Sequence, residues 1–117
     1  MKLITAIVKP DKLEDLISTL VDSGARGLTV TEVRGFGRQY GQLATAHATT
    51  GMPDWRQIAL LPKLRLDVVV PASQAEEVAE AIAKCAGTGT VGDGKIWITP
   101  VDGALRVRTG ERDRAAL

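Results

Sequence analysis

The segment Thr88-Gly-Thr-Val-Gly-Asp-Gly-Lys95 has residue types and spacing suited to holding a phosphate. Its glycines allow successive backbone N–H groups to converge on an anion, and Lys95 adds a positive charge. Gly89 to Lys95 fits the beginning of a P-loop, G-x-x-x-x-G-K. Ile96 then stands where a P-loop has Ser or Thr, and a strand pattern follows instead of a helix. This excludes the P-loop of an NTPase, and leaves a phosphate-binding loop or a flexible turn.

A second segment, Leu105 to Glu111, is predicted to be a short extended stretch that ends in a turn, and it carries two arginines on alternate residues. In an extended stretch, alternation places Arg106 and Arg108 on one face, where two guanidinium groups suit a polyphosphate. A solvated edge strand is the alternative. Taken with Lys95 and the glycines, these arginines predict a nucleotide-phosphate site.

No catalytic set accompanies these cations. The sequence has no Ser/His/Asp order around a sharp turn, no carboxylate pair around a cleft and no Cys/His metal spacing. The single histidine, His47, is interpreted as a solvated loop residue. The single cysteine, Cys85, is interpreted as a small buried hydrophobe, with a reactive thiol as the alternative. A binding module is therefore predicted, and not an enzyme.

Size and composition predict one domain that stays in the cytoplasm. The chain has 117 residues, a net charge of +1 and 3% aromatic residues, which argues against a nucleic-acid partner or general attraction to anionic membranes. The apolar run that starts at Met1 ends at Lys9-Pro10, too short for a signal peptide or a membrane span. Direct membrane insertion is not expected.

The elements that must position these residues form two similar halves, each reading strand, helix, strand. Each helix carries an apolar stripe and a candidate cap, Asp11 with Glu14 in the first and Ser73 with Glu76 in the second. The strands are expected at Leu3–Val8, Leu28–Val33, Leu64–Val70 and Lys95–Val101. The stripes are Leu13, Leu16, Ile17, Leu20 and Val21, then Ala75, Val78, Ala79, Ile82 and Ala83.

This doubled unit predicts an α+β, ferredoxin-like βαββαβ sandwich, an antiparallel four-stranded sheet with two helices on one face. Leu64, Leu66, Val68 and Val70 are expected to face the helices. The other face mixes polar residues with Val69 and Trp97, so self-association is expected. Between the halves, about residues 36–61 form an unusually long loop, whose Ala- and Thr-rich part from Gln42 to Gly51 is expected to order on a ligand or partner.

In these segments the sequence resembles the PII signal-transduction family over almost its whole length. The markers are Ile7-Val-Lys-Pro10, Gly27-Leu-Thr-Val-Thr-Glu-Val-Arg-Gly-Phe-Gly-Arg-Gln39, Leu61-Pro-Lys-Leu64, Thr88 to Lys95, and Arg106-Val-Arg-Thr-Gly-Glu111. The resemblance implies a single domain over residues 1–117, with a T-loop at about 36–61, a phosphate-binding B-loop at about 87–95 and a C-terminal loop at about 105–117.

The resemblance also implies a homotrimer with ATP, ADP or AMP bound in clefts between subunits. The implied nucleotide-binding residues are Thr29, Gly37, Arg38, Thr88, Gly89, Val91, Gly92, Asp93, Gly94, Lys95, Arg106 and Arg108. A second ligand, 2-oxoglutarate or bicarbonate, would meet Gln39, Tyr40, Gly41, Lys63 and Gly92, with Mg²⁺ on Gln39. No catalytic cofactor is implied.

Two departures from the family pattern affect these expectations. The only tyrosine, Tyr40, lies at the base of the T-loop, so no tyrosine modification is predicted, and the partner surface differs from the family norm. Thr90 stands where many members have lysine, which favours ADP or AMP over ATP.

The first hypothesis is an energy sensor whose T-loop docks on an unidentified target, a membrane transporter or a metabolic enzyme, linked to inorganic-carbon uptake. The second is a nitrogen regulator sensing MgATP with 2-oxoglutarate. The third is a weak nucleotide hydrolase that uses Lys95.

Overall fold

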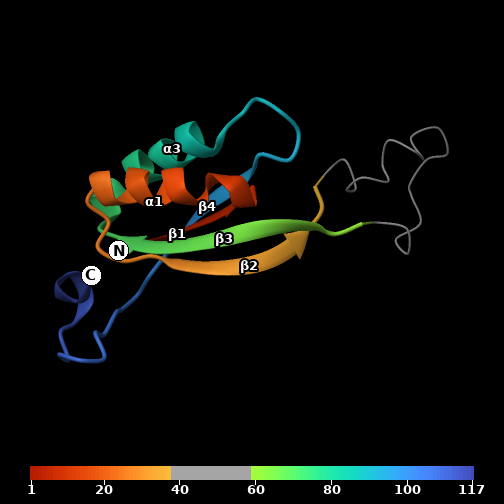
Figure 1. The fold of residues 1–117 in the computed structure, drawn as a ribbon. Coiled ribbons are helices and arrows are strands. Elements are labelled where there is room, and N and C mark those ends of the chain that lie inside the picture. The colour runs from red at the N-terminus through yellow and green to blue at the C-terminus, as the bar shows by residue number, and fades with distance from the viewer. Residues whose placement is uncertain (38–58) are drawn as a thin grey trace.

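The computed structural model describes residues 1–37 and 59–117 (Figure 1). Its elements, in chain order, are β1 (Lys2–Val8), η1 (Pro10–Lys12), α1 (Leu13–Asp22), β2 (Thr29–Gly35), β3 (Leu61–Val70), η4 (Ala72–Gln74), α3 (Ala75–Ala86), β4 (Gly94–Pro100) and η5 (Asp113–Ala116). The sheet order is β2-β3-β1-β4 with every pair antiparallel, and α1 and α3 cover one face. The predicted ferredoxin-like arrangement is confirmed.

The core lies between this covered face and the two helices, and the strand alternation places its residues. The β3 residues predicted to face the helices are all buried, and Ile4, Ala6 and Val8 of β1 join them. The buried helix residues are Leu16, Leu20, Ala75, Val78, Ile82 and Ala86. Cys85 is half-buried and packs against this core, as a small hydrophobe would.

The predicted stripes were too wide at three positions. Val21 is 63% exposed and Ile17 39% exposed, and Ala83 is also exposed. The buried strip of each helix is narrower than the predicted stripe, and it is centred on Leu16 and Leu20 in α1 and on Val78 and Ile82 in α3.

The predicted caps were wrong, because each helix is entered through a proline and a short 3₁₀ turn. Asp11 lies inside η1, for which Lys9 is the N-cap and Pro10 the first residue. Ser73 lies inside η4, which follows Pro71, and neither this turn nor α3 has a side-chain cap. Because the proline ring already holds φ near the helical value, the turn begins before the position that the capping pattern indicates.

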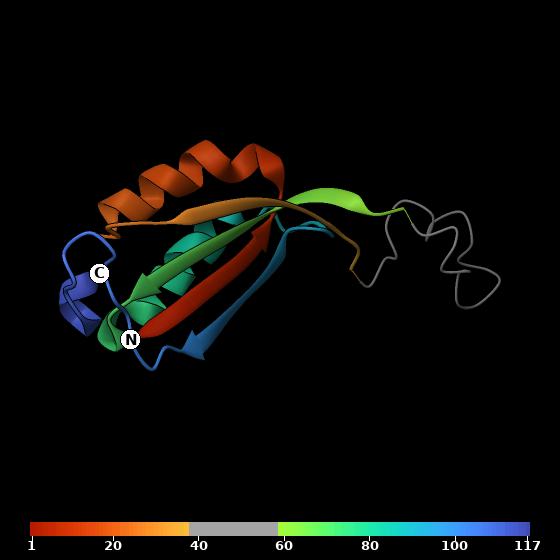
Figure 2. The same cartoon turned by 90° about the horizontal axis from the view of Figure 1, so that it is seen from below.

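The C-terminal segment leaves the sheet after β4 and lies at the end where β1 begins, while the loop between α3 and β4 lies at the opposite end (Figure 2). Of the prediction for Leu105 to Glu111, the turn at the end is present, whereas the extended conformation through Arg106 and Arg108 is wrong. Leu105 bridges Arg112, and the chain turns at Val107–Thr109 with the Gly110 N–H donating to the Arg106 carbonyl at 2.9 Å. Alternation therefore does not place Arg106 beside Arg108.

Candidate functional site

The glycine-rich loop, residues 87–93, is braced by the carboxylate of Asp93. Oδ2 accepts the N–H of Thr88 at 2.7 Å and that of Gly89 at 2.9 Å, and Oδ1 accepts the Thr88 hydroxyl. The N–H groups of Thr88 and Gly89 are thus already used. The N–H groups of Val91 and Gly92 donate to no other atom in the described part of the chain, so these two groups remain as donors for an anion.

Two lysines tie this loop to the sheet. Lys9, just after β1, places Nζ 3.0 Å from the Thr90 hydroxyl and 3.1 Å from Asp93 Oδ1. Lys63 in β3 donates from Nζ to the Gly92 carbonyl at 2.6 Å. Sequence reasoning missed the role of Lys9, because its partner lies more than eighty residues away. The contacts of Lys9 and Lys63 therefore fix the conformation of the loop and place two ammonium groups against it.

We expect the Asp93 brace to make stability depend on pH. Hydrogen bonds from the Thr88 hydroxyl and N–H, followed by those from Lys9 and Gly89, hold the pKa of Asp93 well below its usual range. Because the folded pKa is depressed, this contribution is complete above the unfolded pKa of about 4 and is lost as the pH falls towards the folded value. In urea unfolding, Asp93→Asn should flatten the acid side of the stability profile.

The matched control is Asp102→Asn, a change at an exposed carboxylate that makes no hydrogen bond in the described structure. It should leave the acid side of the profile as in the wild type. Parallel profiles for the wild type and Asp93→Asn below about pH 4 would contradict the brace.

A cavity of about 620 Å³, here called the loop cavity, lies beside the glycine-rich loop, at the end of the sheet where β4 begins. Its walls combine apolar surface from Ile7 and Trp97 with the ammonium groups of Lys63 and Lys95. The other lining residues are Gly35, Phe36, Gly37, Leu61, Val91, Gly92 and Gly94. This mixture suits a ligand with a flat apolar part and an anionic part.

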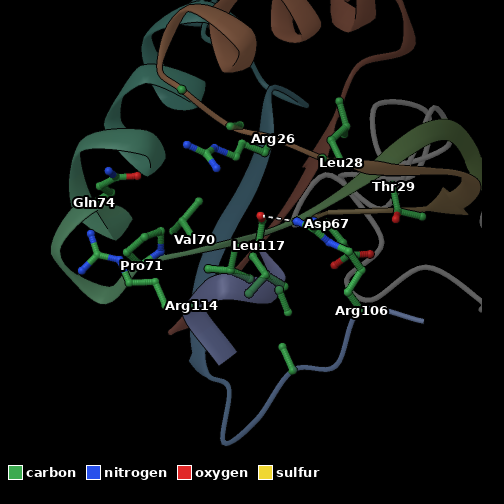
Figure 3. A pocket seen from close by; sticks show the side chains of 16 residues that line it. Arg26, Leu28, Thr29, Asp67, Val70, Pro71, Gln74, Arg106, Arg114 and Leu117 are labelled. Carbon is green, nitrogen blue, oxygen red and sulfur yellow. Dashed lines mark hydrogen bonds between the residues drawn. The ribbon is translucent and has the colours of Figure 1, made fainter. Parts of the chain in front are cut away.

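A second cavity of about 840 Å³, the C-terminal cavity, lies where the segment after β4 meets the loop before β2 (Figure 3). Thr29 and Asp67, which pair across β2 and β3, line it together with three arginines, Arg26, Arg106 and Arg114. Figure 3 shows Arg106 donating to the backbone oxygen of Leu117, at 2.8 Å. Guanidinium groups dominate the charge here, so the cavity favours an anion.

Among the described residues, Asp67 is the one acidic side chain that lines the C-terminal cavity, and its charge is already compensated. It accepts from the Thr5 hydroxyl at 2.7 Å and from Arg65 Nε at 2.9 Å. Burial raises the pKa of Asp67, but the hydrogen bonds from Arg65 and Thr5 and the charge of Arg65 outweigh it, so the net pKa is lowered. It therefore does not cancel the three arginines.

The predicted nucleotide residues thus fall into two groups at opposite ends of one subunit. Gly37, Val91, Gly92, Gly94 and Lys95 line the loop cavity, whereas Thr29 and Arg106 line the C-terminal cavity. Lys63, predicted for the second ligand, lies with the first group. Thr88, Gly89 and Asp93 brace the loop, and Arg108 lines neither cavity. Arg38, Gln39, Tyr40 and Gly41 lie outside the described residues, as do His47 and the tract from Gln42 to Gly51.

The sheet keeps these two groups apart. In the β1–β4 pair, Gly94 opposes Val8 at one end and Pro100 opposes Lys2 at the other. Six residue steps along a strand are about 20 Å. Lys95 and Arg106 of one subunit therefore lie at different ends, and both can reach one ligand only if they come from different copies of the chain.

Within the described residues, no cluster of three or more His, Cys, Asp or Glu side chains is arranged to hold a metal ion. Nor does any helix in residues 1–37 or 59–117 have the length and apolar character needed to cross a membrane.

Comparison with known proteins extends the resemblance seen in the sequence. The family model described as nitrogen regulatory protein P-II matches residues 1–111. Nitrogen regulatory protein GlnK of Escherichia coli (strain K12) is 46% identical over 117 residues, the full length of both chains. The nitrogen regulatory proteins P-II of Haemophilus influenzae and of Synechocystis are 45% and 42% identical, again over the full length of both chains. The similarity therefore covers both cavities and the segment between β2 and β3.

Proposed function

This chain belongs to the nitrogen regulatory P-II family, and from that premise we propose that it binds adenine nucleotides in clefts between the subunits of a homotrimer. It acts as a signalling protein, not as an enzyme. Nucleotide binding changes the T-loop, which docks on a target protein in the cytoplasm. The target is a transporter or a metabolic enzyme.

The observation that carries this proposal is the separation of the two cavities. The loop cavity offers Lys95 and the N–H groups of Val91 and Gly92 for phosphates. The C-terminal cavity offers Arg106 and the hydroxyl of Thr29. Each cavity is half of a nucleotide site, and a neighbouring copy supplies the other half when the subunits assemble with the two ends together.

Calorimetry with ATP, ADP and AMP tests the proposal. At least one of these three nucleotides should bind, with one molecule in each inter-subunit cleft. Because Thr90 supplies a hydroxyl where a lysine would add a charge, Thr90→Lys should tighten the binding of ATP more than that of AMP. Absence of heat with all three nucleotides, from protein shown to be folded and assembled, would contradict the proposal.

A second candidate function is the sensing of MgATP together with 2-oxoglutarate, and the position of Lys63 favours it. Its ammonium group lies in the loop cavity and is held on the Gly92 carbonyl, where it can meet the carboxylate of a keto-acid. Gln39 would hold the magnesium ion, with Tyr40 and Gly41 beside the keto-acid, all outside the described residues. A shared site demands coupling, so 2-oxoglutarate should raise the affinity for MgATP.

An unchanged affinity for MgATP in the presence of 2-oxoglutarate would count against this second candidate. The same titration with bicarbonate tests the link to inorganic-carbon uptake. A change in nucleotide affinity with bicarbonate alone would favour that branch of the proposal.

A further inference from the structure

Arg106 already holds an anion from its own chain. Its Nη1 lies 3.2 Å from Glu111 Oε1, and its Nη2 donates to the backbone oxygen of Leu117 at 2.8 Å. A phosphate binds a guanidinium best through two parallel hydrogen bonds. Both terminal nitrogens of Arg106 are engaged here, so a phosphate that takes both must displace Glu111 and the Leu117 oxygen or share the guanidinium group with them.

The backbone presents Glu111 to Arg106. The Arg106 N–H donates to the Glu111 carbonyl at 2.9 Å, and the Gly110 N–H donates to the Arg106 carbonyl at the same distance. Gly110 has a φ of +74°, which closes the turn between them. The side chains therefore face each other because the turn is closed, and not because two long side chains meet by chance on the surface.

The contrast with the other predicted phosphate ligands singles out this pair. Neither Lys95 nor Arg108 has a carboxylate partner in the described part of the chain. Arg26 and Arg114, which line the same cavity as Arg106, have none there either. Among these five cations, only Arg106 is neutralised by the protein itself.

We propose that Glu111 is a built-in competitor of the nucleotide phosphates for Arg106, and so a determinant of which nucleotide the site prefers. The inference rests on the proposed function. Binding replaces the carboxylate of Glu111 with a phosphate. A carboxylate left near the phosphates repels ATP more than AMP, because ATP carries more negative charge. Glu111 therefore lowers the affinity for ATP more than it lowers the affinity for AMP.

The test is calorimetric titration of Glu111→Gln with ATP and AMP at fixed salt. Glutamine keeps the size of the side chain and removes its charge. Removing the competing Arg106–Glu111 ion pair should raise the affinity of Glu111→Gln for ATP by about two- to five-fold, the range that corresponds to the energy of an exposed ion pair. The gain in affinity for AMP should be smaller. In an Arg106→Ala background the same substitution should give a clearly smaller gain, because the competition is lost. Glu80→Gln, an exposed glutamate of α3 outside both cavities, is the matched control and should bind as the wild type does.

An ATP affinity that is unchanged or weaker in Glu111→Gln would overturn the inference while leaving the proposed function intact. So would an equal gain in the Arg106→Ala background, or an equal gain for ATP and AMP. Failure of wild type and Glu111→Gln to bind any nucleotide would remove the proposed function, and this inference with it.

Discussion

Replacing Gly94 with alanine is expected to lower the free energy of unfolding by about 3 kcal/mol or more. Gly94 opens β4 with a φ of +110°, a region that L-residues rarely adopt. A Cβ at this position would lie 1.7 Å from the carbonyl oxygen of Ile7 and 2.8 Å from its carbonyl carbon. These are backbone atoms of β1, so no side-chain rotation relieves the clash, and the two strands must separate where Val8 pairs with Gly94.

Gly89→Ala is the matched control for this prediction. Gly89 lies in the glycine-rich loop that precedes β4 and has a φ of +78°, but a Cβ there would meet no atom within 4 Å. Only conformational strain of about 1–2 kcal/mol is therefore expected. Urea unfolding monitored by Trp fluorescence and by circular dichroism measures both variants. Equal losses for the two would show that the close approach to β1 contributes nothing.

Lys95→Ala and Arg106→Ala are each expected to weaken nucleotide binding by about 10- to 100-fold, the effect of losing one charge-assisted hydrogen bond to a phosphate. The sharper result comes from mixing them. Lys95 lies at one end of the subunit and Arg106 at the other, so in the proposed site between two copies each copy supplies one of these residues. A subunit that lacks Lys95 still offers its intact Arg106 to its neighbour.

Unfolding the two variants together and refolding them at equal amounts should restore sites of wild-type affinity. Random assortment gives about a quarter of the clefts an intact Lys95 facing an intact Arg106. Each variant refolded alone should show none. If the mixture also shows none, although mass spectrometry confirms mixed assemblies, the two residues do not belong to one site and the proposed inter-subunit cleft is wrong.

Alternation along the strands was sufficient to predict the covered face of the sheet. Apolar side chains at every second residue of β3 share one face of the strand, so this face is expected to lie against the core. These residues are Leu64, Leu66, Val68 and Val70, and all four are buried. The starts of the helices could not be read in this way. A capping pattern and a proline-led turn compete for the same few residues, and here Pro10 begins the first turn and Pro71 immediately precedes the second.

The site was only partly predictable, because some of its contacts depend on the folded shape of the chain and not on the identity of single residues. Glycine content and charge identified Lys95 and Arg106, since these are properties of single residues. The brace of Asp93 on Thr88 depends on the shape of the closed loop, and the pair of Arg106 with Glu111 depends on the turn at Gly110. Neither has a periodic pattern. The predicted nucleotide residues lie at two opposite ends of the sheet because of how the strands pair, and strand pairing cannot be read from any single sequence motif.

Thr5 is the only fully buried polar side chain in the part of the chain that the structure describes, and its hydroxyl donates to Asp67. These two residues are direct partners in the β1–β3 pair, and Asp67 is also the partner of Thr29 in the β2–β3 pair. If β1 slipped by one residue, Thr5 would oppose Leu66 or Val68 and its hydroxyl would lose its acceptor. The Thr5–Asp67 hydrogen bond thus favours the native register of β1 on β3 over a register shifted by one residue. Since the register decides which residues reach each end of the sheet, this hydrogen bond also helps to fix where the two cavities lie relative to each other.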